Sequence, residues 1–195
     1  METQPFIEQL KAIVGTANVI HHPEDLLVFE YDGSVDRGVP TAVVFPASTD
    51  EVSRVMALAY REGVLVVGRG SGTGLSGGSI APPRGIQIAF TRMNRILEVD
   101  AENRTATVEP GVINLDLDAR AHKQGLRYAP DPSSQKACSL GGNIAENAGG
   151  PHCLAYGTTT NHVLGMEVVL EDGVVVNLGS LAGSPVYEIP GYDLR

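Results

Sequence analysis

The chain has 195 residues, of which 43% are hydrophobic, so it has room for one domain of ordinary size or two small lobes. Its formal net charge of −9 argues against nucleic acid or an acidic membrane surface as the main partner, because both require a basic face. No apolar run is long enough for a membrane-spanning helix, and the amino-terminal segment lacks the pattern of a signal peptide, so we expect a cytoplasmic protein.

Alternating helix and strand patterns fill the first half of the chain. An apolar stripe predicts a helix over residues 3–14, and short strands are predicted over 17–22 and 41–46. A buried strand over 64–68 follows the helix pattern of residues 48–63. Strand, helix and strand within about 30 residues predict a parallel βαβ unit.

The helix of residues 48–63 has the clearest signals at its two ends. Ser48 and Glu51 fit a capping box, in which the side chain of each residue satisfies the free backbone N–H group of the other. Gly63 is typical of the left-handed residue that ends a helix. We therefore expect both ends of this helix to be fixed locally.

The second half combines strands with one further regular helix. Strands are predicted over residues 85–90, 95–100 and 104–111 from their alternation of apolar and polar side chains. A helix is predicted over 114–124, with Asn114 as its cap and a glycine immediately after it. The mixture of strands and helices predicts an α+β fold.

Residues 127–162 show little periodicity, and an irregular stretch of that length within a domain is usually functional. Their apolar and glycine content argues against disorder. Ser139 is placed to cap a short helix running to about Ala148. A hairpin is predicted over 163–179, with its turn at Asp172–Gly173.

These elements predict two lobes, the first over residues 1–98 and the second over residues 99–195. Each lobe contains one glycine-rich segment: residues 68–78 in the first lobe, and the irregular stretch of residues 127–162 in the second. Because glycine lets a ligand or another backbone approach closely, the two segments are the candidate binding elements.

The stretch of residues 68–78, GRGSGTGLSGG, is more than half glycine and follows a predicted strand. Three of its glycines match the GxGxxG spacing of a Rossmann site, but that site needs a helix to begin within the motif, and Pro82 and Pro83 forbid one. We predict instead a nest of consecutive backbone N–H groups that holds phosphate oxygens, with Arg69 adding charge. The alternative is a turn that serves packing alone.

The irregular stretch offers small polar side chains and glycines, which suit a flat, hydrogen-bonding ligand. His152 is either a proton-transfer group or, as the interpretation that we favour, a hydrogen-bonded loop histidine. Cys138 and Cys153 are interpreted as core or site-lining thiols and not as a disulfide. No set of His, Cys and carboxylate residues has the spacing of metal ligands, so no metal is expected.

Three motifs together closely resemble the FAD-binding domain of the FAD-linked oxidases, the fold shared by vanillyl-alcohol oxidase and p-cresol methylhydroxylase. The motifs are GRGSGTGLSGG, APDPSSQKACSLGGNIAENAGGPHCLAYGTTTNHVLG and VVLEDGVVVNLG, in the expected order. The resemblance covers the chain from about Val39 onward. Within the family, the chain is most similar to the branch that contains the D subunit of bacterial glycolate oxidase and the D-lactate dehydrogenases.

The resemblance implies that FAD lies between the two lobes. The first loop would wrap the pyrophosphate through backbone N–H groups, and the second segment would line the flavin and the phosphates. The cofactor-binding residues implied are Gly68, Arg69, Gly70, Ser71, Gly72, Thr73, Gly74, Leu75, Ser76, Pro130, Asp131, Pro132, Ser139, Gly142, Asn143, Asn147, Gly149, Gly150, Tyr156, Gly157 and Thr158.

Some members of this family attach the flavin covalently, often through a histidine in the first loop. Residues 68–78 contain no histidine, so we expect non-covalent FAD, with Cys138 as the remaining candidate for attachment. In the family, a substrate domain follows the flavin-binding part and carries the residues that hold the hydroxy acid. The chain ends at Arg195, so we expect it to be truncated before that domain. No catalytic residue is assigned, and the chain alone is expected to be nearly inactive.

The resemblance implies an oxidoreductase in which a 2-hydroxy acid such as glycolate or D-lactate delivers a hydride to flavin N5 and becomes a 2-keto acid. The reduced flavin would pass its electrons to a quinone, an iron–sulfur partner subunit or a cytochrome, and partner subunits are one route to a peripheral association with the membrane. Two alternatives stay open. One is an FAD-binding module or subunit without catalysis of its own, and the other is an enolpyruvyl-UDP-sugar reductase-like member of the fold.

Overall fold

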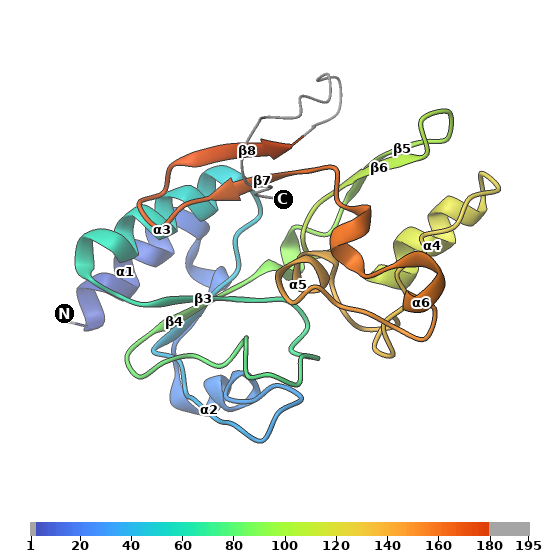
Figure 1. Ribbon diagram of the computed structural model, residues 1–195. Helices are drawn as coiled ribbons and strands as arrows, with labels where there is room; N and C mark the ends of the chain where they lie inside the picture. The colour runs from blue at the N-terminus through green and yellow to red at the C-terminus, as the bar shows by residue number, and fades with distance from the viewer. Residues whose placement is uncertain (1–2, 180–195) are drawn as a thin grey trace.

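A four-stranded sheet forms the centre of the first half of the molecule (Figure 1) in the computed structural model, which describes residues 3–179. Its strands lie in the order β1 (Val19–Ile20), β2 (Ala42–Val44), β4 (Ile86–Ala89) and β3 (Val66–Arg69). Strand β1 runs antiparallel to β2, whereas β2 and β3 both run parallel to β4. The predicted parallel βαβ unit is therefore confirmed, with β4 inserted between its two strands.

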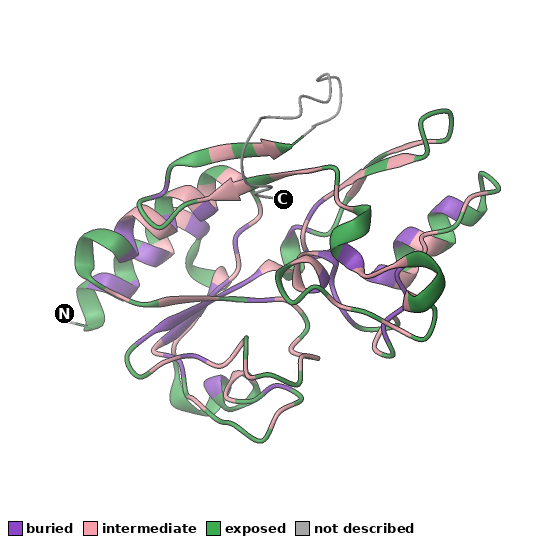
Figure 2. Cartoon of the chain, in the orientation of Figure 1, coloured by how far each residue is buried: buried purple, intermediate pink, exposed green. Residues whose placement is uncertain are grey.

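Helices α1 (Thr3–Val14) and α3 (Thr49–Glu62) pack together with the sheet around one buried apolar cluster. Phe6 of α1, Val55 of α3 and Ile88 of β4 are almost fully buried in it. Figure 2 shows this buried stripe on the sides of both helices that face the strands. Both helices form where the apolar stripes of the sequence predicted them.

The opposite side of the sheet has a smaller core. The one-turn helix α2 (Pro23–Leu26) contributes Leu26, which packs with Val43 and Ala89, and Phe29 and Phe45 extend this cluster. The strands are thus covered on both sides, which explains why every residue of β4 is buried.

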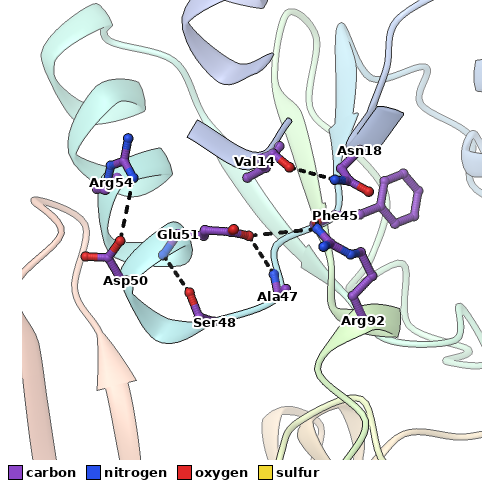
Figure 3. Close-up of polar contacts among 9 residues, drawn as sticks. All are labelled: Val14, Asn18, Phe45, Ala47, Ser48, Asp50, Glu51, Arg54 and Arg92. Carbon is purple, nitrogen blue, oxygen red and sulfur yellow. Dashed lines mark hydrogen bonds and ion pairs between the residues drawn. The ribbon is translucent and has the colours of Figure 1, made fainter. Parts of the chain in front are cut away.

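The amino-terminal end of α3 differs in one detail from the predicted capping box (Figure 3). Ser48 Oγ accepts a hydrogen bond from the Glu51 N–H group at 3.2 Å, as predicted. The Glu51 carboxylate, however, accepts from the N–H group of Ala47 at 2.7 Å and not from that of Ser48. Ala47 lies beyond the end of β2, where no strand partner takes its N–H group. Gly63 ends the helix with φ of +63°, which confirms the predicted stop.

The second half begins with an antiparallel hairpin of β5 (Ile96–Asp100) and β6 (Thr105–Val108), followed by helix α4 (Asn114–His122). The predicted cap is wrong, because Ile113 is the N-cap and Asn114 is the first helical residue. The Asn114 side chain is buried and donates to the Pro130 carbonyl oxygen at 3.1 Å. Because this long-range hydrogen bond uses the Asn114 amide, that side chain does not cap the helix. The helix also ends two residues before the predicted end.

The irregular stretch contains two short helices, α5 (Leu140–Ala145) and α6 (Cys153–Tyr156). The predicted cap of α5 is confirmed, since Ser139 Oγ accepts from the Gly142 N–H group at 3.3 Å. The helix ends before Ala148, because Asn147 adopts φ of +47°, which no α-helix continues. A third buried cluster joins this region to α4 and to the β5–β6 hairpin.

The predicted carboxyl-terminal hairpin is confirmed as β7 (Gly165–Val169) and β8 (Val175–Gly179). It lies over α3 of the first half (Figure 1), where Ser53 Oγ donates to the Gly173 carbonyl oxygen at 2.6 Å.

The lobe boundary at residue 98 stays a prediction. The turns predicted beyond the hairpin lie outside the described residues. Across residues 3–179, no helix combines the length and the apolar character needed to cross a bilayer.

Candidate cofactor site

The first glycine-rich loop follows β3 directly and presents its backbone without internal hydrogen bonds. Within the described part of the chain, none of the N–H groups from Ser71 to Ser79 donates a hydrogen bond to another protein group. Gly72 and Gly77 have φ of +67° and +75°, a conformation that glycine adopts without strain. A row of free N–H donors is the arrangement that binds phosphate oxygens in a backbone nest.

The two glycine-rich segments meet at Gly70. A Cβ atom on Gly70 would overlap Ser139 Oγ and would lie 3.8 Å from the Cα atom of Gly142. A Cβ atom on Gly78 would likewise overlap the carboxylate of Glu146, just beyond α5. The structure thus brings the first loop against both ends of α5, and at Gly70 a larger residue would have to displace the buried Ser139 side chain.

A cavity of about 240 Å³ lies at this meeting point. Gly70 and Ser71 line it from the first loop, and Ser139 lines it from the second segment. Sequence reasoning missed three polar lining residues, Thr91, Asn94 and Asp116, the last of which lies in α4. Thr91 and Asn94 follow β4, which runs parallel to β3, so the loops after both strands emerge at the same edge of the sheet. That shared edge is the signal that could have identified them.

Arg69 does not present its guanidinium on the surface of the loop. The residue is 7% exposed, and its Nη2 atom donates to the Tyr31 carbonyl oxygen at 2.9 Å while its guanidinium lies 5.6 Å from the centre of the Phe29 ring. A Cβ atom on Gly72 would overlap this guanidinium, so the arginine lies beneath the loop. Burial lowers the pKa of Arg69, and the nearby Asp32 carboxylate opposes that shift.

The second segment uses its backbone in the opposite way. The N–H groups of Leu140, Gly141 and Asn143 all donate to backbone carbonyl oxygens. One side-chain donor there stays free, because the buried Nδ2 atom of Asn143 has no partner within the described residues. This side of the cleft therefore offers side-chain polarity and close packing instead of a row of backbone donors.

Asp131 and His152 join two parts of the second segment. The buried Asp131 carboxylate accepts from His152 Nδ1, and the His152 backbone N–H group is 3.5 Å from the same carboxylate. The hydrogen bond from His152 lowers the pKa of Asp131, with a further contribution from the charge of Arg127. A Cβ atom on Gly150 would overlap the Asp131 carbonyl oxygen. His152 is thus the hydrogen-bonded loop histidine that the sequence favoured.

The remaining predicted residues of the second segment hold one another in place. Asn147 Oδ1 accepts from the Thr160 N–H group at 3.0 Å, and the Thr158 N–H group donates to the side chain of Asn161 at 3.0 Å. Cys153 Sγ accepts from the Gly150 N–H group at 2.9 Å.

Three of the predicted cofactor-binding residues, Gly70, Ser71 and Ser139, line the cavity. The predicted residues that do not line it are Gly68, Arg69, Gly72, Thr73, Gly74, Leu75, Ser76, Pro130, Asp131, Pro132, Gly142, Asn143, Asn147, Gly149, Gly150, Tyr156, Gly157 and Thr158.

The two cysteines are free in the structure, with Cys138 buried and Cys153 half-buried, which agrees with the interpretation from the sequence. Among residues 3–179, no group of three or more His, Cys, Asp or Glu side chains is arranged to hold a metal ion. The polar side chains that line the cavity are those of Ser71, Thr91, Asn94, Asp116 and Ser139, and of these Asp116 carries a charge.

A bare backbone loop that faces a second glycine-rich segment across a cleft defines a protein that binds a phosphate-bearing cofactor. The chain belongs to the FAD-binding domain family, whose model matches residues 40–179. FAD is therefore the cofactor, and the site fits it, because the free N–H groups of residues 71–79 are suited to donate to phosphate oxygens.

Known proteins support the same assignment. The chain is 43% identical to the glycolate oxidase subunit GlcD of Bacillus subtilis over all of this chain and 41% of that protein. It is 42% identical to a D-lactate dehydrogenase of Archaeoglobus fulgidus over 97% of this chain and 41% of that protein. The chain thus spans about two fifths of the length of these relatives.

The solved structure of p-cresol methylhydroxylase with substrate bound superimposes with a TM-score of 0.79 at 23% identity. The match covers 92% of this chain and 36% of that one. At this level of identity, the comparison establishes the fold alone. The predicted p-cresol methylhydroxylase-type fold is therefore confirmed.

Proposed function

We propose that the chain is the FAD-binding part of a flavin-dependent oxidoreductase that acts on a 2-hydroxy acid of the glycolate or D-lactate type. The observation that carries the proposal is the row of free N–H groups from Ser71 to Ser79, held at Gly70 against the second glycine-rich segment. The substrate class is supported by the names of two relatives, a glycolate oxidase subunit and a D-lactate dehydrogenase.

The residues of this chain bind and orient the cofactor in this proposal. The N–H groups of the first loop donate to the diphosphate, and Ser139, which lines the cavity, contributes a hydroxyl from the second segment. FAD, when bound, supplies the hydride acceptor at N5. No histidine lies in residues 68–78, which supports non-covalent attachment.

The proposal places the binding of the substrate and of electron-transfer partners outside the residues of this chain. This chain matches 41% of the length of each of these two relatives, so we place the residues that hold the hydroxy acid in the part that it does not match. The Bacillus subtilis relative is named a subunit, which supports partner subunits as electron acceptors. A cytoplasmic location, with membrane contact through such partners, belongs to the same proposal.

The test is a fluorescence titration of the purified chain with FAD, followed by anaerobic addition of glycolate, D-lactate or NADPH. Binding with bleaching of the flavin absorbance by a hydroxy acid supports the full proposal. Binding without bleaching restricts the chain to an FAD-binding module, and bleaching by NADPH alone identifies a reductase of the same fold. Absence of FAD binding overturns the proposal. A mass spectrum of the denatured protein checks that no flavin is covalently attached.

A further inference from the structure

Residues 31–38, here called the supporting segment, lie against the first glycine-rich loop. The Gly33 N–H group donates to the Gly74 carbonyl oxygen at 2.8 Å, and a Cβ atom on Gly33 would lie 2.8 Å from that oxygen. A Cβ atom on Gly38 would overlap the Ala81 carbonyl oxygen. The segment thus touches the loop at Gly74 and the residues just after the loop at Ala81, although it precedes the residues matched by the family model.

Two buried charges join the supporting segment to the loop. Arg69, at the start of the loop, donates to the Tyr31 carbonyl oxygen at 2.9 Å. Asp32 accepts from the Ser34 N–H group at 2.8 Å, and Ser79 Oγ lies 3.4 Å from the same carboxylate. Burial would raise the pKa of Asp32, but the hydrogen bonds from Ser34 and Ser79 outweigh it and lower that pKa. Buried charges are tolerated only where partners compensate them, so each segment needs the other in place.

Gln87 fixes this joint to the sheet. Its side chain is fully buried on β4, and Nε2 donates both to the Phe29 carbonyl oxygen at 3.0 Å and to the Ser79 carbonyl oxygen at 2.8 Å. One amide therefore bonds the residues just before the supporting segment and the end of the loop. The sheet, the supporting segment and the loop form one connected unit.

The loop depends on contacts with other segments for its conformation, because its own backbone N–H groups do not stabilise it. Its N–H groups from Ser71 to Ser79 make no hydrogen bonds within the described structure, and glycine loses more conformational entropy on ordering than any other residue. If the ligand has to order such a loop on binding, the entropy cost of ordering weakens its affinity. A loop that is already ordered before binding avoids this cost and binds the ligand more tightly.

We propose that the supporting segment holds the loop in its anion-binding conformation, and that Arg69 is a positioning residue that acts from beneath the loop. The inference rests on the proposed FAD site at this loop. Arg69 makes its contacts with Tyr31 and Phe29 and lies under Gly72, so its effect on the diphosphate is transmitted through the backbone.

The test compares Arg69→Met and Arg69→Lys with Arg54→Met. Arg54 is the matched control, because it is an exposed arginine of α3, outside the supporting segment and the loop, that pairs with Asp50 at 3.6 Å. We measure FAD affinity, the melting temperature without FAD, and hydrogen exchange of residues 70–79. Arg69→Met is expected to weaken FAD binding about tenfold, equal to about 1.4 kcal/mol, and to speed exchange in the loop. Arg69→Lys should recover part of both effects, and Arg54→Met should change neither.

A second variant, Gly33→Ala, separates positioning from folding, because its added Cβ atom would press on the loop at Gly74, Leu75 and Thr73. Faster loop exchange together with weaker FAD binding at an unchanged melting temperature supports the inference. A lower melting temperature with unchanged FAD affinity and unchanged loop exchange overturns it. If the unaltered chain does not bind FAD, the proposed function fails, and loop exchange in Arg69→Met and Gly33→Ala still decides whether the segment holds the loop.

Discussion

The two glycine-rich segments of the cleft differ in how they use their backbone N–H groups. In the first loop, the N–H groups from Ser71 to Ser79 make no protein hydrogen bond within the described residues. In the second segment, the N–H groups of Leu140, Gly141 and Asn143 are all bonded to carbonyl oxygens. Glycine therefore permits close packing in both segments, as at Gly70, and in the first segment it also leaves a row of donors free. Substitutions in the first segment should change ligand affinity, whereas most substitutions in the second should change stability.

The largest effect is expected where the two segments meet. Gly70→Ala places a Cβ atom against Ser139 Oγ and should separate the segments, since overpacking at such a contact costs about 1–3 kcal/mol. FAD binding should weaken by at least about tenfold, as measured by flavin fluorescence titration alongside thermal unfolding. Gly68→Ala is the control, because its Cβ atom would lie 3.5 Å from the Phe90 ring, an ordinary contact. Unchanged FAD affinity in Gly70→Ala would contradict the site.

The two serine caps provide the next comparison. Ser139→Ala and Ser48→Ala each remove a hydroxyl that accepts from a helix N–H group, and each should cost about 1 kcal/mol of stability. Only Ser139 lines the cavity, so only its substitution should also weaken FAD binding, by a few-fold. Parallel thermal melts and FAD titrations check this. Equal FAD affinity in the two variants would show that Ser139 serves the helix alone.

A buried threonine of the second segment should affect stability without affecting binding. Thr159 is fully buried, and its Oγ1 atom donates to the Ala148 carbonyl oxygen at 2.7 Å. Thr159→Val should lower the free energy of unfolding by about 1 kcal/mol in denaturant titrations. Thr160→Val, at an exposed neighbouring position, should change little. A selective loss of FAD affinity in Thr159→Val would contradict the expectation that the first segment governs ligand affinity and the second mainly governs stability.

The smallest effect is expected at Asp131, and it depends on pH. The hydrogen bond from His152 lowers the pKa of Asp131 in the folded protein. Its stabilisation is therefore complete above the unfolded pKa of about 3.9 and is lost as the pH falls through the lower folded value. Asp131→Asn should cost about 0.5 kcal/mol at neutral pH, because the His152 side chain is half exposed, and it should flatten the acid side of the stability profile. Thermal melts of both proteins from pH 6 downward test this, and parallel profiles would exclude a role for the pair.

Local patterns predicted the elements well where one residue and its near neighbours decide the structure. The stripe of α3, the Gly63 stop and the Ser139 cap depend on periodicity or on a contact within three residues, and all were found. The errors came where distant groups compete. Asn114 bonds to Pro130 instead of capping its helix, and Glu51 bonds to Ala47. The two candidate segments were visible as glycine-rich stretches, but the cavity residues after β4 were missed because the pairing of β3 with β4 was not known.

The sequence alone determined the bare loop after a strand, the absence of a Rossmann helix at Pro82 and Pro83, and the resemblance to the FAD-linked oxidases. These properties depend on the chemistry and the order of neighbouring residues. The tertiary structure decided which N–H groups stay free, where Arg69 points, and that residues 31–38 and the final hairpin return to contact earlier or later parts of the chain. Such features depend on tertiary contacts between groups that are far apart in the sequence, and local sequence patterns do not predict those contacts.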